Sequence, residues 1–85
     1  MATKTVTVGS SVGLHARPAG IIAEAALNSG AEVTLAVDGG EPVDAGSALM
    51  IMTLGATHGT QVTVSSDDAA ALEAIAGLVA RDLDA

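Results

Sequence analysis

Residues 13–19 have the sequence Gly13-Leu14-His15-Ala16-Arg17-Pro18-Ala19, and here the chain changes from a strand pattern to a helix pattern. Pro18 has no backbone N–H and is tolerated in the first turn of a helix, where that group would have no partner anyway. Apolar residues then recur at helical spacing until Asn28-Ser29-Gly30, a combination typical of a helix end. The sequence therefore predicts a helix that begins beside His15.

His15 is expected where the helix offers free N–H groups and the positive end of its dipole, which together favour anions. An imidazole nitrogen is a nucleophile that can take a phosphoryl group. A phosphoryl group on His15 would be stabilised by the amides of Ala16 and Arg17 and by the Arg17 guanidinium. We therefore expect a phosphoryl-transfer site at His15 and Arg17, supported by Ala16 and Pro18. The alternative is that His15 only caps the helix and Arg17 is solvated.

The composition excludes several classes of function. The chain has 85 residues, enough for one domain over residues 1–85 with a modest core. Its net charge of −7 and its lack of aromatic residues argue against nucleic acid and anionic membranes as partners. It has no cysteine, no apolar stretch long enough for a bilayer and no signal-peptide pattern after Met1. We expect a monomer in the cytoplasm.

The rest of the chain divides into short elements. Alternation predicts strands over 5–8, 33–37, 41–45 and 61–65, with Pro42 suited to a sheet edge. Short helices are predicted from Ser47 to Met52 and after Ser66-Asp67-Asp68. The order β-α-β-β-α-β-α predicts an α+β open-faced sandwich, a four-stranded antiparallel sheet with three helices on one face. The expected core positions of the first and last helices are Ala19, Ile22, Ala23, Ala26, Leu27, Leu72, Ile75, Ala76, Val79 and Leu83.

Two segments of the chain resemble signatures of the histidine-containing phosphocarrier (HPr) family of the bacterial phosphoenolpyruvate-dependent sugar phosphotransferase system. Residues 13–19 resemble the active-site motif of that family. The second signature is resembled by Gly46-Ser47-Ala48-Leu49-Met50-Ile51-Met52-Thr53-Leu54-Gly55. The resemblance extends over the whole chain, with the same order of elements and nearly the same length. The resemblance implies the α+β open-faced sandwich, the same fold that the order of the elements predicts.

The resemblance also implies a function. Enzyme I, charged by phosphoenolpyruvate, would pass phosphate to Nδ1 of His15, giving the pros-phosphohistidine. His15 would then pass the phosphate to IIA domains of sugar permeases. The chain would be a transfer intermediate that partner enzymes turn over and not itself an enzyme. No metal or small cofactor is expected on the carrier.

A docking surface for both partners is expected beside His15. Ile21 would lie on the helix face opposite the core, together with Gly20. Ala48 and Leu49 of the short second helix would extend this apolar patch, as the usual interface of the family implies. The alternative is that one or more of these residues are simply buried.

Ser47 has two interpretations. As a helix N-cap it would contribute about 0.5–2 kcal/mol to stability. It also aligns with a serine that an ATP-dependent kinase phosphorylates in some HPr proteins, and a phosphate there would add negative charge to the docking patch. A basic residue often precedes that serine in the family, whereas this chain has Gly46.

Other candidates and functions remain open at this stage. His58 is expected to be a solvated turn residue. Ser10-Ser11 are expected to be loop residues, and the alternative is that they help to receive the phosphate. The chain could be a paralogous carrier of a nitrogen- or dihydroxyacetone-linked phosphorelay, which the motif around His15 does not distinguish. It could also be a regulatory binding module that is not phosphorylated and acts through its apolar patch.

Overall fold

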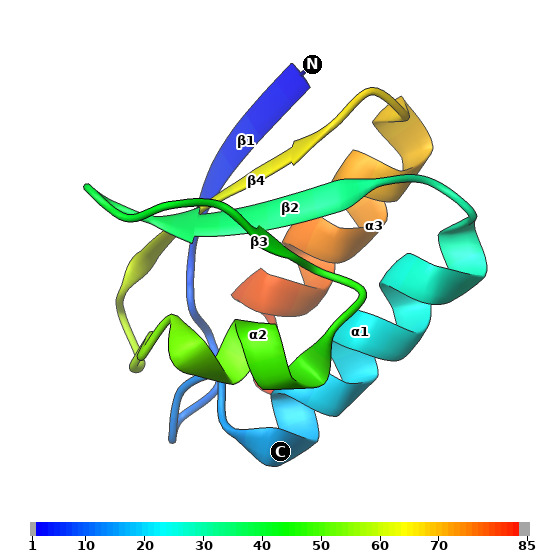
Figure 1. Ribbon diagram of the computed structural model, residues 1–85. Helices are drawn as coiled ribbons and strands as arrows, with labels where there is room; N and C mark the ends of the chain where they lie inside the picture. The colour runs from blue at the N-terminus through cyan, green and yellow to red at the C-terminus, as the bar shows by residue number, and fades with distance from the viewer. Residues whose placement is uncertain (1, 84–85) are drawn as a thin grey trace.

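The computed structural model describes residues 2–83, in which three helices cover one face of a four-stranded sheet (Figure 1). This arrangement confirms the predicted α+β open-faced sandwich. The elements are, in chain order, β1 (Ala2–Thr7), α1 (Ala16–Ser29), β2 (Val33–Val37), β3 (Val43–Asp44), α2 (Ala48–Thr53), β4 (Gln61–Ser66) and α3 (Ala69–Ala80).

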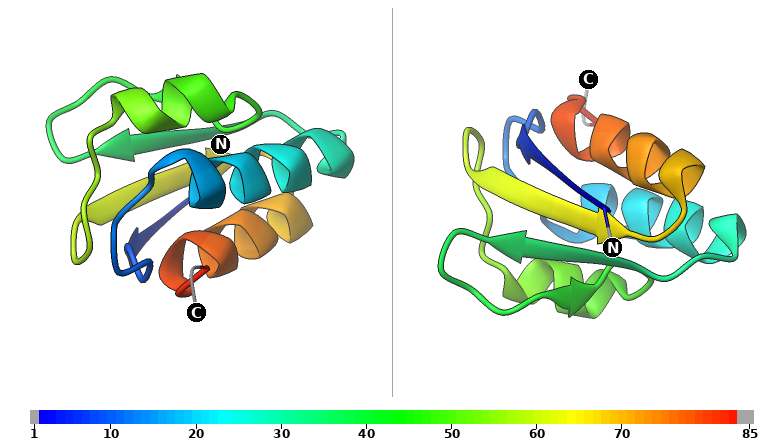
Figure 2. Two further views of the ribbon diagram at one scale, coloured as in Figure 1. Left: turned by 90° about the horizontal axis from the view of Figure 1, so that it is seen from below. Right: turned by 90° about the horizontal axis from the view of Figure 1, so that it is seen from above.

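The sheet has the strand order β1-β4-β2-β3, and every neighbouring pair is antiparallel. Alternate residues of β4 explain why only one face is covered. Val62 and Val64 are fully buried under the helices, while Thr63 and Ser65, which alternate with them along the strand, stay partly exposed. Figure 2 shows the helices together on one side of the sheet and the other side open.

The core between the sheet and the helices is aliphatic, because the chain has no aromatic residue. Each layer contributes fully buried side chains, among them Ile22, Leu35, Ile51 and Ile75. Burying one side chain of this size stabilises a fold by about 1.5–3 kcal/mol. The single buried residue of α2 is Ile51, so this short helix is held to the core by one main anchor.

Helices α1 and α3 lie side by side and run in opposite directions across the sheet (Figure 1 and Figure 2). The N-terminus of α1 is therefore at the opposite end of the molecule from the N-terminus of α3. Helix α2 packs beside α1 and beside β3. This arrangement places the loop that precedes α1 between the end of α2 and the end of α3.

The predicted strand boundaries were partly wrong. β1 begins at Ala2 and not at Thr5, because β4 is long enough to pair with Ala2 and Thr3 as well. The prediction of a strand over 41–45 was too long, since only Val43 and Asp44 pair with β2. The last helix opens within the predicted segment, with Asp68 as its N-cap.

Two predicted core positions also differ. Leu27 of α1 is 69% exposed, because smaller side chains at Ala23 and Ala26 already fill the contact of this helix with the core. Leu27 lies instead beside Gly46, where a Cβ added to the glycine would be 3.1 Å from Leu27 Cδ2. Leu83 lies beyond the end of α3 but is still partly buried against the core.

Candidate functional site

The loop before α1 is held from two sides. Gly9 donates its N–H to the Val79 carbonyl at 3.0 Å, and a Cβ at Gly9 would lie only 2.0 Å from the Ala80 oxygen. Gly13 has a φ of +81°, and a Cβ there would lie 2.5 Å from the Ala56 oxygen. Both glycines are therefore needed for close approach of the backbone, which fixes where His15 begins the helix.

Hydrogen bonds complete this anchoring. The Leu14 amide donates to the Ala56 carbonyl at 2.9 Å, and the Leu14 side chain is buried. The Ser10 side chain is fully buried; its hydroxyl donates to the Arg81 carbonyl and accepts from the Leu83 amide, each at 3.4 Å. Ser10 thus ties the loop to the end of α3, and the alternative that it receives phosphate is wrong.

His15 is the N-cap residue of α1 and is exposed. Its backbone is extended, with φ −85° and ψ −166°, and its carbonyl accepts from the Ala19 amide at 2.9 Å. Its side chain makes no capping hydrogen bond to the helix, in contrast to the capping alternative for this histidine. The imidazole therefore lies beside the first turn of α1 without occupying its amides.

Two amides remain available in that first turn. Pro18 has no N–H, and the amides of Ala16 and Arg17 make no hydrogen bond to any other residue within 2–83. The Arg17 side chain is exposed and forms no ion pair within the same range. The start of α1 thus combines two free donors, the helix dipole and one guanidinium, a combination suited to an anion.

An open hollow lies beside His15. It is lined by Val12, Leu14, His15, Met52, Gly55, Ala56 and Thr57. The lining is mostly apolar, and three segments contribute to it: the loop before α1, the end of α2 and the loop that follows α2. The histidine is therefore reachable from a broad surface and does not lie in a deep pocket.

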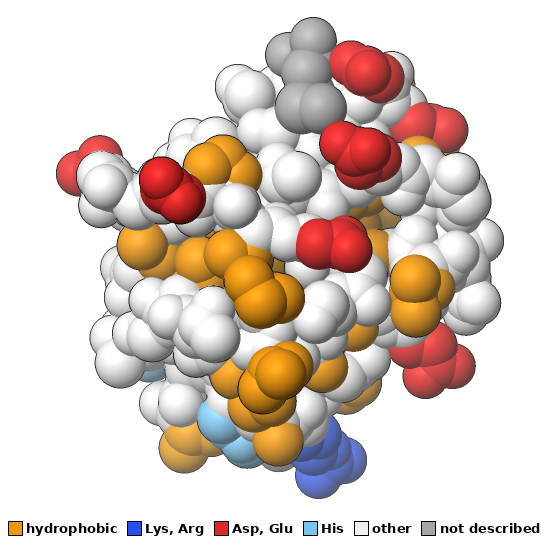
Figure 3. Space-filling model, in the orientation of Figure 1, with side chains coloured by type: hydrophobic (Ala, Val, Ile, Leu, Met, Phe, Trp, Pro, Cys, Tyr) orange, Lys and Arg blue, Asp and Glu red, His pale blue; other side chains and the backbone are white. Residues whose placement is uncertain are grey.

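Exposed large apolar side chains gather on the same side of the molecule. Among the described residues, these side chains are between 37% and 69% exposed, and all come from the loop before α1, from α1 or from α2. We call them the apolar face: Val12, Ile21, Leu27, Leu49, Met50 and Met52. In Figure 3, apolar side chains continue down to pale-blue histidine atoms and a blue basic patch at the lower edge, while acidic side chains lie mainly in the upper half.

The predicted docking residues have different degrees of exposure. Ile21 and Leu49 are exposed, as the docking interpretation requires, while Gly20 and Ala48 are half-buried beside them. The assignment of Leu27 to the core was wrong, and neither Met50 nor Met52 was predicted to belong to this surface. The pattern did contain a signal, because a short helix with one buried residue, Ile51, must expose the residues on either side of it.

Ser47 is half-buried and is the N-cap of α2, as predicted. Its Oγ accepts a hydrogen bond from the Met50 amide at 3.2 Å. His58 lies in an exposed turn, which agrees with its expected role. No group of three or more side chains of the metal-ligating types is close enough within residues 2–83 to hold a metal ion.

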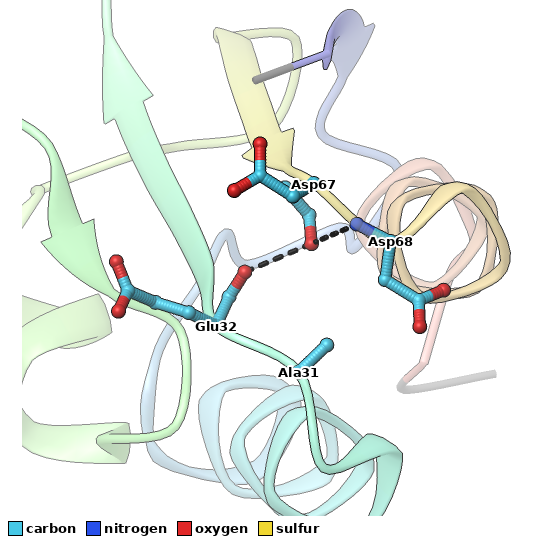
Figure 4. Close-up of a pocket in the computed structure, with 5 residues that line it drawn as sticks. Ala31, Glu32, Asp67 and Asp68 are labelled. Carbon is cyan, nitrogen blue, oxygen red and sulfur yellow. Dashed lines mark hydrogen bonds between the residues drawn. The ribbon is translucent and has the colours of Figure 1, made fainter.

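A second hollow lies at the N-terminus of α3, away from His15 (Figure 4). It is lined by Ala31, Glu32, Ser66, Asp67 and Asp68. The Ser66 hydroxyl donates to the Glu32 carbonyl at 2.8 Å and accepts from the Asp68 amide at 3.2 Å. With three carboxylates around it, this hollow is unsuited to phosphate.

None of the helices in residues 2–83 is both long and apolar enough to span a bilayer.

Comparisons with known proteins agree with this geometry. Residues 2–81 match the family described as PTS HPr component phosphorylation site. The chain is 46% identical to the phosphocarrier protein HPr of Streptomyces coelicolor, over 99% of this chain and 94% of that protein. This chain belongs to the HPr family.

A solved structure and a second sequence relative also resemble this chain. The HPr family fold is found in the crystal structure of a phosphocarrier protein HPr from Bacillus anthracis, with a TM-score of 0.84 and 33% identity over 92% of this chain and 95% of that one. The chain is also 32% identical to the phosphocarrier protein NPr of Klebsiella oxytoca, over 91% of this chain and 86% of that protein. Family membership places the chain among the phosphocarrier proteins of the HPr type.

Proposed function

We propose that His15 accepts a phosphoryl group from phosphorylated Enzyme I and passes it to the IIA domains of sugar permeases. Membership of the HPr family supports a carrier role in general. The observation that carries the assignment of the site is the position of His15 as an exposed N-cap beside the free amides of Ala16 and Arg17. A phosphoryl group on His15 would find two donors already oriented and the dipole of α1 behind them.

In the accepting step, an imidazole nitrogen of His15 attacks phosphorus. The family resemblance assigns this role to Nδ1. A nitrogen–phosphorus bond forms while the bond from phosphorus to Enzyme I breaks, and the reverse exchange occurs on the IIA domain. Arg17 stabilises the charge that develops on the phosphoryl oxygens, and Pro18 fixes the first turn that presents the amides.

The exposed position of His15 suits a group that is handed from one protein to another. A carrier must stabilise phosphohistidine enough to hold it, but a deep pocket would block the second partner. Two amides and one arginine at the surface provide moderate stabilisation. The His15 imidazole can then enter the active sites of two different partners in turn.

The apolar face provides the docking surface for both partners. Gly20 and Ile21 of α1 and Ala48 and Leu49 of α2 lie within or beside it. Contacts in the middle of such a surface exclude water and contribute most of the binding energy. Arg17 and Glu24 are the charged residues on this side of α1, so docking depends mainly on apolar contact.

Ser47 is proposed as a regulatory phosphosite within the same surface. Its position at the N-terminus of α2, two residues before Leu49 of the apolar face, supports this role, because a phosphate there would repel acidic partner surfaces. Its hydroxyl is also the N-cap of α2, so a kinase must gain access to a group that already accepts a hydrogen bond. Treatment with ATP and cell extract, followed by a search for an acid-stable phosphate absent in Ser47→Ala, tests this assignment.

A paralogous carrier is the second candidate function. The 32% identity to the phosphocarrier protein NPr of Klebsiella oxytoca favours it, although the 46% identity to an HPr protein is higher. Both functions use His15 in the same way, but with different donors and acceptors. A panel of phosphorylated Enzyme I paralogues and purified IIA domains separates them by the rate of transfer.

The first experiment measures intact mass after the protein is mixed with phosphoenolpyruvate and catalytic Enzyme I. One acid-labile phosphoryl group is expected on the wild type and none on His15→Ala. The same proposal includes the state of the carrier: we propose that the chain acts as one carrier domain, as a monomer and in the cytoplasm. The mass experiment itself has one outcome that contradicts the sugar-carrier assignment. If no mass is added although Enzyme I phosphorylates a known carrier, the sugar-carrier assignment is wrong, and the paralogous relay or the binding module takes its place.

A further inference from the structure

Two exposed methionines flank the buried anchor of α2. Met50 is 41% exposed and Met52 is 38% exposed, whereas Ile51 between them is fully buried. The chain has three methionines and no cysteine, so its sulfur chemistry is limited to thioethers. Exposed thioethers react with peroxides, and buried ones react much less.

Both methionines belong to the apolar face. Met52 also lines the hollow beside His15, together with Val12 and Leu14. Any partner that reaches the His15 imidazole from this side must cover the Met52 side chain. The unbranched, polarizable methionine side chain suits a surface that must fit two different partners.

We propose that Met50 and Met52 form a peroxide-sensitive modification site that lowers phosphoryl transfer when it is oxidised. This inference rests on the proposed carrier function. In each step a lone pair on Sδ attacks one oxygen of a hydroperoxide. The sulfur–oxygen bond forms as the oxygen–oxygen bond breaks, and water or an alcohol leaves. The sulfur is oxidised by two electrons, and the peroxide is reduced by two.

Oxidation changes the surface without removing the support of α2. A sulfoxide is a strongly polar group, and placing it in an apolar interface costs desolvation energy when a partner binds. The helix itself depends on the buried Ile51 and on the Ser47 cap, neither of which contains sulfur. The oxidised protein should therefore remain folded while its docking weakens.

The modification is reversible in principle. Methionine sulfoxide reductases remove the oxygen as water at the expense of a thiol reductant, which becomes a disulfide. Because the two sites are exposed, such a reductase can reach them in the folded protein. Recovery of transfer after reductase treatment would therefore separate oxidation of this site from irreversible damage.

The experiment treats the full-length protein with dilute hydrogen peroxide and maps the sulfoxides by peptide mass. The same samples are assayed for the initial rate of phosphoryl transfer from Enzyme I. We expect one added oxygen at Met50 and one at Met52, and a roughly tenfold rise in the KM for Enzyme I. Reductase treatment should restore the original KM. Circular dichroism on the same samples checks that the fold is kept.

The matched control is the variant Met50→Leu/Met52→Leu, in which the volume and apolar character of both side chains are preserved. The untreated variant provides its own reference rate, and peroxide should leave its KM for Enzyme I unchanged, even where Met1 is oxidised. Sulfoxides at both sites with an unchanged KM would overturn this inference but leave the proposed carrier function standing. So would a failure of both sites to oxidise under conditions that oxidise a methionine peptide. If the untreated wild type accepts no phosphate, the proposed function fails first and the inference falls with it.

Discussion

The N-terminus of α1 and the N-terminus of α3 lie at opposite ends of the molecule and satisfy their amides in different ways (Figure 1). At α3, the Asp68 side chain accepts from the Ala71 amide at 3.0 Å. At α1, the N-cap is His15, whose side chain makes no capping bond. One helix start is closed by a carboxylate of the chain itself. At the other, the amides of Ala16 and Arg17 have no hydrogen-bond partner among residues 2–83.

The surroundings of the two helix starts differ in the same sense. Glu32 and Asp67 lie around the start of α3, so an external anion would meet negative charge there (Figure 4). The start of α1 has Arg17 and the apolar side chains of Val12 and Met52 nearby. The same backbone donors therefore stabilise the fold at one end and are available to a phosphoryl group at the other.

The largest expected effect comes from giving α1 an ordinary cap. Asparagine is a good N-cap residue, so in His15→Asn it should accept from an amide of the first turn. Stability to urea should stay the same or rise by up to about 1 kcal/mol. Phosphate acceptance should be lost completely, because the nucleophile is gone and the amides are occupied. Intact mass after incubation with Enzyme I and phosphoenolpyruvate measures the loss of phosphate acceptance.

The variant His58→Asn provides the matched control, since it removes the other histidine from an exposed turn. It should accept one phosphoryl group as the wild type does. An acid-labile phosphate that persists in His15→Asn would show that a different residue is the acceptor.

The second effect concerns the charge beside the open amides. In Arg17→Ala, transfer should slow by roughly 100-fold, the usual loss when one donor to a transition-state charge is removed. The urea midpoint should not change, because Arg17 has no ion-pair partner within residues 2–83. Rapid-quench measurements of transfer from Enzyme I provide the rate.

The control is Lys4→Ala, which removes one positive charge from the far side of the molecule. Lys4 pairs with Glu73 at 2.7 Å on the exposed surface, and its loss should leave the transfer rate unchanged. Equal slowing in both variants would mean that net charge matters and that Arg17 has no specific role.

A smaller effect is expected at the apolar face. Leu49→Asp places a charge at a well-exposed position of α2, and the KM for Enzyme I should rise roughly tenfold with kcat unchanged. Ala74→Asp adds the same charge at an exposed position of α3 and should leave the KM unchanged. If the two variants have the same KM, the docking surface lies elsewhere.

Much of this comparison could be predicted from the sequence. Pro18 and the apolar spacing after it indicated where α1 begins, and Gly30 indicated where it ends. Asp68 next to an apolar run indicated the start of α3. These signals are local, because caps and helix-breaking residues act within one turn.

The rest depends on contacts between distant segments. Whether Leu27 is buried depends on the way α1 packs against α2, and the length of β1 depends on its partner β4. The role of Ser10 as a tie to the end of α3 joins residues more than seventy positions apart. No local pattern carries such information, so these features were missed or assigned wrongly.

The smallest effect is expected at the N-terminus of α3, where Asp68 caps the first turn. Asp68→Ala removes the hydrogen bond to the Ala71 amide and the favourable charge at the start of α3, so the protein should lose about 1 kcal/mol of stability to urea. Phosphoryl transfer should be unaffected, since the start of α3 is far from His15. Asp68→Asn keeps a capping oxygen and should recover most of the stability. If transfer is slower in Asp68→Ala under conditions where the variant is fully folded, the division of roles between the two helix starts is wrong.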